Sequence, residues 1–387
     1  MKGFFYEFCI FFAMNTQDIL IVGGGLAGLT AAIHLAGLGH AVALFETKEY
    51  PHHKVCGEYI SNEVLPYLDR LDIDIWGNGA QKISDFKMSS TDGKEIGTKL
   101  PLGGFGMSRF ALDHLLYQKA KKLGVQFYFE KAVDIRFSEN RFTITTHTEA
   151  NYHSKTVIGA YGKRSVLDKT LQRDFINDKN AWLAVKAHYQ LESFPEGQVA
   201  LHNFEGGYGG LSKTETGAVN FCYLAHYDSF KKHNSIEKFN ERVVSKNPHL
   251  EQFLTRASPL FKVPLTIAQI SFGQKEPVLD HILMCGDTAG LIHPLCGNGM
   301  AMAIHSAKLA SECIDMYLSD DTLSRSWLEQ EYQRRWNKTF KKRLWFGRKL
   351  QNILLRKRWA NFGVATAGNS KPLLKYIIAK THGKPIA

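Results

Sequence analysis

The segment between Asp18 and Glu46 constrains the fold more than any other part of the chain. An apolar run, DILIV at residues 18–22, leads directly into the glycine-rich stretch GGGLAG at residues 23–28. The apolar residues that follow recur at helical spacing, and AVALFE at 41–46 returns to the character of a strand. This order predicts a β-α-β unit whose helix N-terminus binds the diphosphate of a dinucleotide.

Each glycine of the G-x-G-x-x-G motif has a predicted role. Gly23 permits the tight turn, Gly25 lets the backbone approach the diphosphate, and Gly28 lets the helix pack closely on the strand. Glu46 ends the second strand, where a carboxylate accepts hydrogen bonds from ribose hydroxyls. Because an acid at this position disfavours a 2′-phosphate, the motif predicts FAD or NAD rather than NADP.

A second glycine-containing segment, CGDTAG at residues 285–290, lies far along the chain. With both motifs in this order, the stretch from about Asp18 to Leu318 resembles the flavoprotein superfamily of p-hydroxybenzoate hydroxylase and the geranylgeranyl reductases. In that family the late segment contacts the ribityl chain and diphosphate of FAD, which implies this role for Gly286 and Asp287. The resemblance therefore implies FAD rather than NAD as the bound cofactor.

The resemblance extends beyond these two motifs. Arg109 matches an arginine that approaches FAD at the head of a helix, and Val133 occupies the place of a backbone contact to adenine. Gly297, Asn298 and Gly299 would bring bare backbone to the start of a helix, whose dipole stabilises negative charge on the reduced flavin. The predicted cofactor-binding residues are Gly23, Gly25, Leu26, Ala27, Gly28, Glu46, Cys56, Gly57, Arg109, Val133, Gly286, Asp287, Gly297, Asn298 and Gly299.

The segment KVCGE at residues 54–58 looks like the K-x-C-G segment of geranylgeranyl reductase-like proteins. The resemblance implies that Gly57 permits a close approach to the flavin ring and that Cys56 lies beside the ring as a soft contact or a proton donor. A small buried cysteine without chemistry is the alternative. His293, in the predicted flavin loop, is a second candidate acid or base. The six cysteines form no C-x-x-C pair, so we predict no metal site.

Three departures from the family narrow the function. The middle motif, AYGKRS, has Tyr161 where hydroxylases have the aspartate that serves FAD and the pyridine nucleotide, although Lys163 and Arg164 could attract phosphates. The tryptophans never form W-x-W-x-I-P, the signature of flavin-dependent halogenases. The segment GGYGGL lacks the proline that ends the aromatic substrate motif of the reductases. Tyr208 in that segment is the candidate substrate residue, and an ordinary hairpin position is the alternative.

The pattern of apolar segments predicts an α/β fold with interleaved domains. A Rossmann-like FAD-binding domain of the p-hydroxybenzoate hydroxylase type is expected at residues 14–80, 105–180 and 278–320. Strand-like segments predict an antiparallel-sheet substrate domain at residues 81–104 and 181–277, followed by a basic helical region at 321–387. Residues 1–13 are expected to be a non-native or disordered extension, because Met14 stands just before the first strand.

The chain has 387 residues, a formal net charge of +11 and no apolar run long enough to cross a membrane. Residues 331–387 hold 15 Lys and Arg against one acid. The segment 340–359 predicts an amphipathic helix that either lies on an anionic membrane or caps the other domains with its aromatics inward. No reading motif accompanies the charge, so we expect no nucleic acid partner. Scattered cysteines favour the reducing cytoplasm, with peripheral contact at the inner membrane face left open.

The motifs predict an FAD-dependent oxidoreductase that is reduced by NAD(P)H and acts on a hydrophobic organic substrate. The K-x-C-G segment favours a geranylgeranyl reductase-like reaction, in which hydride passes to an alkene. A monooxygenase that hydroxylates an aromatic or lipophilic substrate through a C4a-hydroperoxide is the first alternative. A non-catalytic flavin- or lipid-binding protein associated with membranes is the second. The sequence leaves the substrate, the choice of NADH or NADPH and the oligomeric state open.

Overall fold

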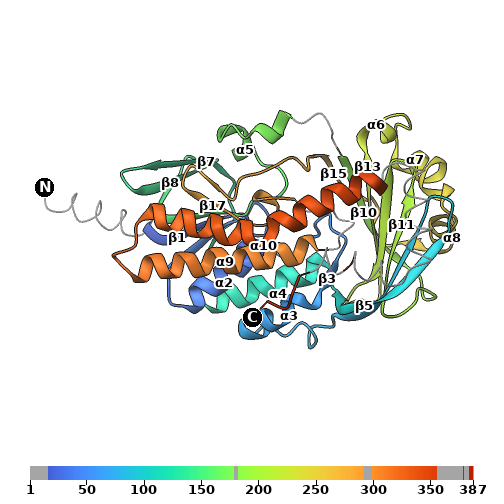
Figure 1. Ribbon diagram of the computed structural model, residues 1–387, viewed down its shortest axis with the longest axis horizontal. Helices are drawn as coiled ribbons and strands as arrows, with labels where there is room; N and C mark the ends of the chain where they lie inside the picture. The colour runs from blue at the N-terminus through green and yellow to red at the C-terminus, as the bar shows by residue number, and fades with distance from the viewer. Residues whose placement is uncertain (1–15, 178–181, 292–297, 355–377, 379–382, 387) are drawn as a thin grey trace, which may run out of the picture.

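The computed structural model describes residues 16–177, 182–291, 298–354, 378 and 383–386. Two β-sheets and a set of long helices organise these residues (Figure 1). The fold is the expected α/β arrangement with interleaved segments, because strands that precede and strands that follow the main part of the second sheet join the first sheet. Among the described ranges, we find no helix whose length and apolar character would let it span a bilayer.

The first sheet has eight strands, and its centre is parallel. Its main path runs in the order β16-β17-β9-β1-β2-β6, and the hairpin β7–β8 pairs with β9. The strands are β1 (Thr16–Val22), β2 (Val42–Phe45), β6 (Gln126–Tyr128), β7 (Ala132–Ser138), β8 (Arg141–Thr146), β9 (Asn151–Gly159), β16 (Val278–Leu279) and β17 (Ile282–Met284). The central strands are apolar on both faces, as parallel strands covered on both sides require.

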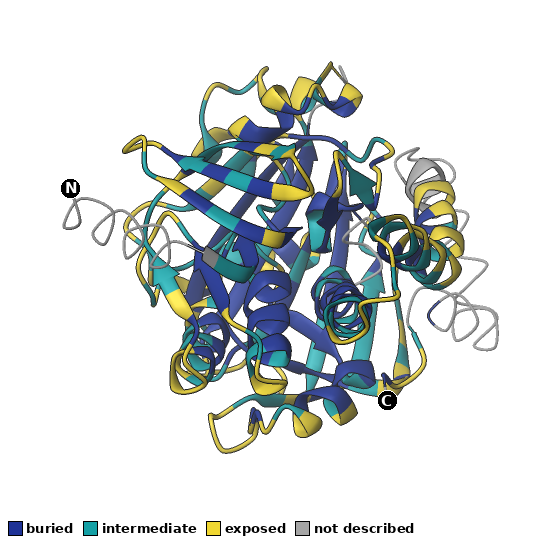
Figure 2. Ribbon diagram, turned by 90° about the vertical axis from the view of Figure 1, so that its left-hand side faces the viewer, coloured by how far each residue is buried: buried dark blue, intermediate teal, exposed yellow. Residues whose placement is uncertain are grey.

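Long helices cover one face of this sheet. Helix α2 (Leu26–Gly37) packs against α4 (Arg109–Lys122) and α9 (Gly299–Ser319), and α10 (Arg325–Leu354) packs on α9. Helices α2 and α9 are almost wholly buried, whereas α4 and α10 are exposed on one side. Figure 2 shows this difference among the helices by colour. Burial follows the sequence, because α2 is rich in Leu and Ala and carries no charged residue. The described core therefore lies between the first sheet and these helices.

The second sheet has nine strands and is antiparallel except between β4 and β11. Its main path runs in the order β14-β10-β13-β12-β11-β4-β5-β3, and β15 pairs with β10. The strands are β3 (Tyr59–Ser61), β4 (Gln81–Ser89), β5 (Glu95–Gly106), β10 (Trp182–Gln190), β11 (Gln198–Phe204), β12 (Gly207–Lys213), β13 (Val219–His226), β14 (Ser258–Pro259) and β15 (Leu265–Ile270). Strand β3 joins this sheet although its residues precede the segment 81–104, and a three-residue strand is too short to show an alternating pattern.

Shorter helices complete the described chain. They are η1 (Asn62–Val64), α3 (Leu65–Arg70), α5 (Val166–Thr170), η2 (Asp174–Asn177), α6 (Tyr227–Phe230), α7 (Ile236–Arg242), η3 (Val244–Lys246), α8 (Pro248–Arg256) and η4 (Gly286–Thr288). Helices α7 and α8 contribute Phe239 and Phe253 to an aromatic cluster with Phe221 and Tyr223 of β13. This cluster covers one side of the second sheet and leaves its other side to face the first sheet across a cavity.

Helix α10 turns an apolar stripe inward. Leu328, Tyr332, Trp336, Phe340 and Leu344 recur every fourth residue, and all are buried in the main core. The Tyr332 hydroxyl donates to the carbonyl of Met284, which fastens α10 to β17. Inward capping therefore describes α10 as far as Leu344, while Trp345 is exposed; residues 355–359 of the predicted amphipathic segment lie outside the described residues.

Candidate functional site

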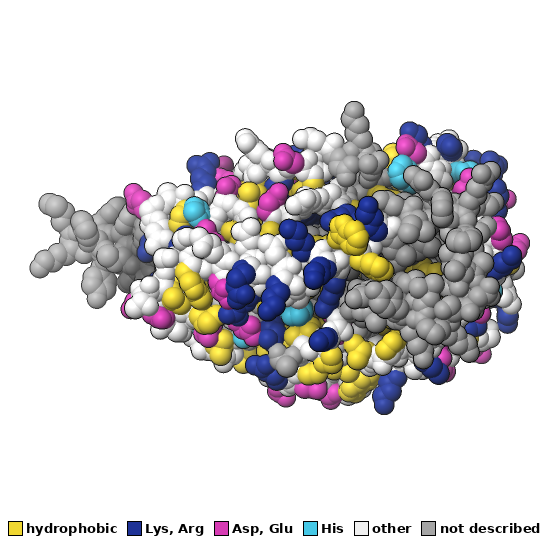
Figure 3. Space-filling model, viewed as in Figure 1, with side chains coloured by type: hydrophobic (Ala, Val, Ile, Leu, Met, Phe, Trp, Pro, Cys, Tyr) yellow, Lys and Arg dark blue, Asp and Glu magenta, His cyan; other side chains and the backbone are white. Residues whose placement is uncertain are grey.

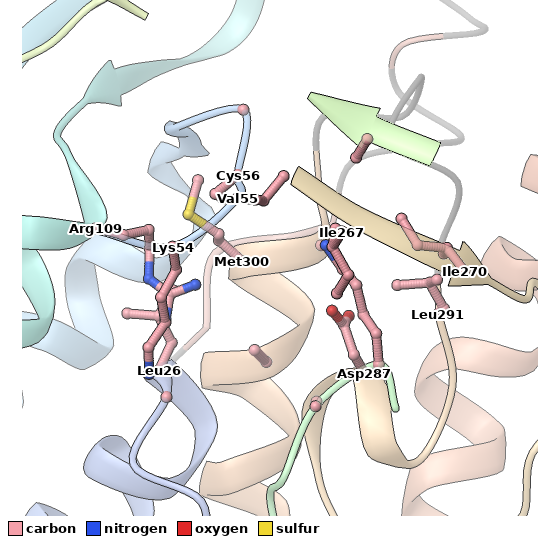
Figure 4. A pocket seen from close by; sticks show the side chains of 18 of the residues that line it. Leu26, Lys54, Val55, Cys56, Arg109, Ile267, Ile270, Asp287, Leu291 and Met300 are labelled. Atoms are coloured by element: carbon pink, nitrogen blue, oxygen red, sulfur yellow. The ribbon is translucent and has the colours of Figure 1, made fainter. Parts of the chain in front are cut away.

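A cavity of about 1000 Å³ separates the first sheet from the second. Glycine-rich turns after β1 and β17 line one part of it, and the inner side of the second sheet lines the other. Figure 4 shows side chains from both parts facing the same space, with Leu26, Lys54 and Arg109 on one side and Asp287, Ile267 and Leu291 on the other. The two glycine motifs therefore share one cavity.

The turn after β1 has the geometry of a phosphate cradle. Gly23 has a φ of +107°, and a Cβ atom there would lie 2.3 Å from the Ala160 carbonyl oxygen. A Cβ atom on Gly28 would lie 1.9 Å from the Gly23 carbonyl oxygen, so α2 packs as closely on the turn as the motif predicts. Gly25 caps α2 without a side-chain hydrogen bond, so first-turn N–H groups remain available for an anion. Gly25, Leu26 and Ala27 line the cavity, which fits the diphosphate of FAD.

Glu46 lies at the cavity where the ribose-binding acid was predicted. Its carboxylate accepts hydrogen bonds from the N–H groups of Gly24 and Thr47, at 3.1 and 2.8 Å, and from Lys54 Nζ at 3.1 Å. Burial opposes ionisation, but Lys54 and the Thr47 N–H outweigh it and hold the pKa of Glu46 below its ordinary value. A ribose hydroxyl would therefore meet an ionised carboxylate that is already oriented by the chain.

Arg109 opens α4 and projects toward the cradle. Its guanidinium donates two hydrogen bonds of 2.7 Å to the fully buried Asp113. A Cβ atom on Gly25 would lie 3.6 Å from Arg109 Nη2, so the guanidinium lies next to the predicted diphosphate position. Burial opposes the charge, but Asp113 and a hydrogen bond with Cys56 raise the pKa of Arg109 above its ordinary value. The arginine thus stays cationic beside both the cradle and the thiol.

The loop that carries Cys56 is held from behind by the second sheet. Asn220 Nδ2 donates to the Gly57 carbonyl at 2.8 Å, and Lys186 Nζ donates to the Lys54 carbonyl at 3.2 Å. Cys56 and Gly57 themselves line the cavity. The sheet that faces the substrate side therefore sets the position of this loop.

A buried charge cluster lies beneath this loop, and the sequence did not predict it. Glu58 and Lys186 are both fully buried and form an ion pair, and His188 Nε2 lies 2.7 Å from the second Glu58 oxygen. The backbone N–H of Arg109 also donates to Glu58 Oε1, at 2.7 Å. Glu58, His188 and His53 lie close enough to resemble a metal site, but the Lys186 ammonium already neutralises the carboxylate. We therefore read the cluster as an ion-pair network.

The Gly-Asp segment forms η4 directly opposite the first motif. A Cβ atom on Gly286, whose φ is +60°, would lie 3.1 Å from the Ala27 Cβ atom, so the two motifs touch. Thr288 Oγ1 accepts a 2.8 Å hydrogen bond from the Gly162 N–H, which brings the middle motif to the same place. Gly286 and Asp287 line the cavity. Three segments that are distant in sequence thus meet where β1, β9 and β17 of the first sheet end.

Lys275 joins two of these segments through their backbones. Its ammonium donates to the carbonyls of Lys163 and Asp287, at 3.1 and 2.8 Å, and lies 4.2 Å from the centre of the Phe175 ring. Only 5% of Lys275 is exposed, and no carboxylate lies within ion-pair distance among the described contacts. Burial lowers the pKa of Lys275 to about 8.

This pKa predicts a pH-dependent stability. The unfolded chain binds the lysine proton more tightly, so the free energy of unfolding rises between about pH 8 and the ordinary pKa of 10.5. The rise is at most about 3 kcal/mol, at 1.4 kcal/mol for each unit of pKa shift. Urea titrations at pH 7.5, 9 and 10.5 measure it, and Lys275→Met lacks the Lys275 contribution. If the free energy of unfolding changed with pH in the same way in the wild type and in Lys275→Met, the lowered pKa of Lys275 would be contradicted.

Most predicted site residues border the cavity. Lining the cavity are Gly23, Gly25, Leu26, Ala27, Glu46, Cys56, Gly57, Arg109, Gly286, Asp287, Asn298, Gly299 and the candidate substrate residue Tyr208. Gly28 does not line the cavity and packs against the glycine turn instead. Val133 does not line it either, but its neighbour Ala132 does. His293 and Gly297 lie outside the described residues.

The half of the cavity next to the second sheet is apolar. Among the described residues of this sheet that line it, none is Asp, Glu, Lys, Arg or His. The larger apolar residues are Phe86, Met88, Leu100, Val199, Leu201, Leu211, Leu224, Ile267 and Ile270. Polar atoms come from Tyr59, Tyr208, Tyr223, Thr266 and Cys222. This half is suited to a hydrophobic organic molecule.

Comparisons with known proteins agree with this geometry. The model of the FAD binding domain family matches residues 16–334. Menaquinone reductase of Mycobacterium tuberculosis is 24% identical over 323 residues, which are 78% of this chain and 77% of that protein. Digeranylgeranylglycerophospholipid reductase 2 of Methanopyrus kandleri is 25% identical over 348 residues, which are 87% of this chain and 86% of that protein.

A solved structure shares the fold. The geranylgeranyl bacteriochlorophyll reductase-like protein of Thermoplasma acidophilum matches with a TM-score of 0.78 at 17% identity, over 95% of this chain and 96% of that one. The family match spans most of the chain, including both glycine motifs. The protein therefore belongs to the FAD binding domain family and is an FAD-dependent oxidoreductase of the geranylgeranyl reductase and p-hydroxybenzoate hydroxylase superfamily.

Proposed function

We propose that this protein is a reductase that uses NAD(P)H to saturate a carbon–carbon double bond of a hydrophobic, isoprenoid-like substrate. The apolar half of the cavity carries the proposal, because it offers contact area and no charged partner among the described residues of the second sheet. A cavity of about 1000 Å³ also leaves room for a second molecule beside a dinucleotide. The names of the two curated relatives, both reductases of lipid-like molecules, support the same class.

The chain's own residues would hold the cofactor across the cavity. The first turn of α2 would bind the diphosphate, Glu46 the ribose, and Asp287 the ribityl hydroxyls. The peptide at Val133 or its neighbour Ala132 would contact the adenine. Bound FAD would accept hydride from the nicotinamide and deliver it to the substrate. Asn298 and Gly299 would direct the N-terminus of α9 toward the negative charge of the reduced ring.

Cys56 would supply the proton that completes the saturated product. Its thiol lies at the cavity beside the Arg109 guanidinium, which stabilises the thiolate that remains after proton transfer. The backbone around it is fixed by Asn220 and Lys186, so the thiol stays in one place during the reaction. Tyr208, which is 4% exposed and lines the same cavity, would contact the substrate.

One assay separates this reaction from hydroxylation in the same cavity. The purified FAD-loaded protein is incubated with NADH or NADPH and with geranylgeraniol, which has double bonds but no quinone ring, with and without oxygen. We expect a product heavier by two hydrogens that forms equally well without oxygen. A product heavier by one oxygen that requires air would replace the proposal with a monooxygenase reaction.

We expect Cys56→Ser to retain FAD and to lose about 100-fold or more in turnover, the range for removal of a general acid. The matched control is Cys222→Ser, because Cys222 also lines the cavity while burial raises its pKa to about 12 and keeps it protonated. Steady-state rates and the absorbance of bound flavin measure the two effects. Unchanged turnover in Cys56→Ser would remove the thiol from the reaction.

The exposed face of α10 is proposed to contact an anionic membrane. Between residues 338 and 349 the helix exposes five cations, Lys338, Lys341, Lys342, Arg348 and Lys349, around Trp345, which is 57% exposed. Figure 3 shows cationic side chains gathered on the face of the molecule that carries α10. Cations around an exposed tryptophan suit the headgroup region of an anionic bilayer.

Vesicle binding tests this contact. At about 1 kcal/mol for each cation near the surface, Lys341→Glu/Lys342→Glu should weaken binding to phosphatidylserine vesicles by about 30-fold or more. Lys121→Glu/Lys122→Glu on α4 is the charge-matched control and should bind nearly as the wild type does. Equal sedimentation of both double variants with the vesicles would contradict the proposed surface.

A further inference from the structure

Helix α4 begins without a carboxylate of its own. Ser108 is its N-cap, and Ser108 Oγ accepts a 3.1 Å hydrogen bond from the Ala111 N–H. A capping box would have Glu or Gln at the position of Ala111, and the first turn of α4 contains no acidic residue. A carboxylate that balances the partial positive charge at this helix end must therefore come from another part of the chain.

Glu215 supplies such a carboxylate from the second sheet. It lies in the turn between β12 and β13, and its two oxygens accept hydrogen bonds from the Ser108 N–H at 2.6 Å and from Ser108 Oγ at 2.7 Å. Because Ser108 is only 1% exposed, both donors depend on this carboxylate for a partner. The contact therefore joins the head of α4 to the tip of a hairpin.

Glu58 supplies a second carboxylate to the same helix end. Its Oε1 accepts the backbone N–H of Arg109 at 2.7 Å, and its carbonyl accepts the N–H of Met107 at 3.2 Å. Lys186 and His188 of β10 bind the same carboxylate. Glu58 has a φ of +56°, a left-handed conformation that is uncommon outside glycine, so its side-chain contacts hold the backbone there. Residues of the second sheet thus hold this carboxylate as well.

Arg109 is the first residue of α4, so these contacts determine where its guanidinium lies. The guanidinium pairs with Asp113, but Asp113 belongs to the same helix and moves with it. That pair fixes the side chain of Arg109 on α4 and does not fix α4 against the cradle. The guanidinium lies next to the diphosphate position at Gly25 and forms a hydrogen bond with Cys56. Figure 4 shows Arg109 beside Lys54 on this side of the cavity.

The hairpin that carries Glu215 also borders the apolar half of the cavity. Tyr208 and Leu211 of β12 and Leu224 of β13 line the cavity. The two strands pair in one antiparallel register without a shift. The same hairpin therefore faces the substrate half with its strands and holds the helix of Arg109 with its tip.

We propose that Glu215 is a positioning residue for the cofactor, which acts through Ser108 and, together with Glu58, fixes Arg109 against the FAD diphosphate. The residue does not line the cavity itself, so its effect on the cofactor passes through α4. The binding part of this inference requires only that FAD is the cofactor. Its consequence for the Cys56 thiol deepens the proposed function and rests on it.

Titration of the FAD-free full chain with FAD measures the first consequence from the change in flavin fluorescence. Glu215→Ala leaves both donors of Ser108 without an acceptor and should weaken FAD binding about tenfold, the size of one hydrogen bond to a charged group. Glu215→Gln keeps one acceptor oxygen and should weaken binding less. Glu196→Ala is the matched control and should stay within about twofold, because Glu196 is exposed and pairs with Lys213 of the same hairpin.

A double-mutant cycle shows whether Glu215 acts through Arg109. In an Arg109→Gln background, Glu215→Ala should change the FAD dissociation constant by less than about twofold, because no guanidinium remains to be positioned. Competition with FAD by ADP and by adenosine gives a second readout that does not need this background. Since only ADP carries the diphosphate, Glu215→Ala should weaken ADP about as much as FAD and leave adenosine unchanged.

Alkylation by iodoacetamide, followed at Cys56 by peptide mass spectrometry, measures the second consequence. It should slow by about threefold or more in FAD-loaded Glu215→Ala, because a displaced guanidinium no longer stabilises the thiolate. The same rate in Glu215→Ala and Glu196→Ala would contradict this part of the inference.

The outcomes separate the positioning role from the proposed reaction. A loss of FAD and ADP affinity that disappears in the Arg109→Gln background, together with isoprenoids that give no product, would leave the role of Glu215 standing and reject the reductase. Saturated product, together with equal FAD affinity in Glu215→Ala and Glu196→Ala, would overturn the positioning role alone. An equal loss for ADP and adenosine would also overturn it, because Glu215 would then only stabilise the fold.

Discussion

A Gly28→Ala variant should lose FAD and unfold well below the wild-type temperature. The added Cβ atom would lie 1.9 Å from the Gly23 carbonyl oxygen, which is backbone and cannot swing away. Helix α2 cannot retreat either, because α4 and α9 pack against it. We expect a loss of about 3 kcal/mol in the free energy of unfolding, at the upper end for overpacking, together with a displaced diphosphate cradle. Thermal unfolding and the ratio of flavin absorbance to protein measure the two effects.

Gly37→Ala is the matched control in the same helix. A Cβ atom on Gly37 meets no other atom within 4 Å, so alanine should be neutral or stabilise the helix by up to about 1 kcal/mol. FAD content should stay at the wild-type level. A Gly28→Ala protein that keeps its FAD and its melting temperature would show that α2 does not pack on the turn as described.

Lys186→Met should be the most destabilising single change in the buried network. It leaves the Glu58 carboxylate without its cationic partner in a fully buried site, which costs about 3–5 kcal/mol in comparable cases. The Lys54 carbonyl loses a hydrogen bond as well, so the Cys56 loop should become mobile and turnover should fall further than bound FAD. Urea unfolding, steady-state rates and the alkylation rate of Cys56 measure these effects.

Two variants isolate the charge effect. The double variant Glu58→Gln/Lys186→Met removes both charges and should recover much of the lost stability, because no unpaired charge remains. Lys99→Met breaks the exposed pair with Asp85 and should change stability by less than about 1 kcal/mol. A Lys186→Met protein that is as stable as Lys99→Met would mean that Glu58 and Lys186 do not form the buried ion pair described.

The sequence was sufficient where one local pattern decides the geometry. The glycine turn after β1 follows from residues that are neighbours in the chain, and the family resemblance located the Gly-Asp segment opposite it. Both segments line the same cavity, and a Cβ atom on Gly286 would touch Ala27. The fold class and the FAD cofactor could therefore be predicted from the sequence.

Contacts between distant residues could not be read in the same way. Glu58 and Lys186 stand 128 positions apart, and Ser108 and Glu215 stand 107 apart, with no spacing rule that would pair them. The strand near the predicted adenine contact is locally irregular as well, since the pairing of β7 with β8 shifts register between Ala132 and Asp134, and Ala132 rather than Val133 lines the cavity. Such an irregularity moves a side chain to the other face of the strand, and alternation in the sequence does not reveal it.

Hydrogen exchange with and without FAD tests the central claim most directly. One FAD held between the two glycine motifs predicts that binding slows exchange in two separate peptides, one spanning Gly23 to Leu29 and one spanning Gly286 to Leu291. Peptides from the outer face of the second sheet, such as 248–256, should exchange equally in both samples. Protection confined to the first peptide would contradict the account, because the Gly-Asp segment would then take no part in binding.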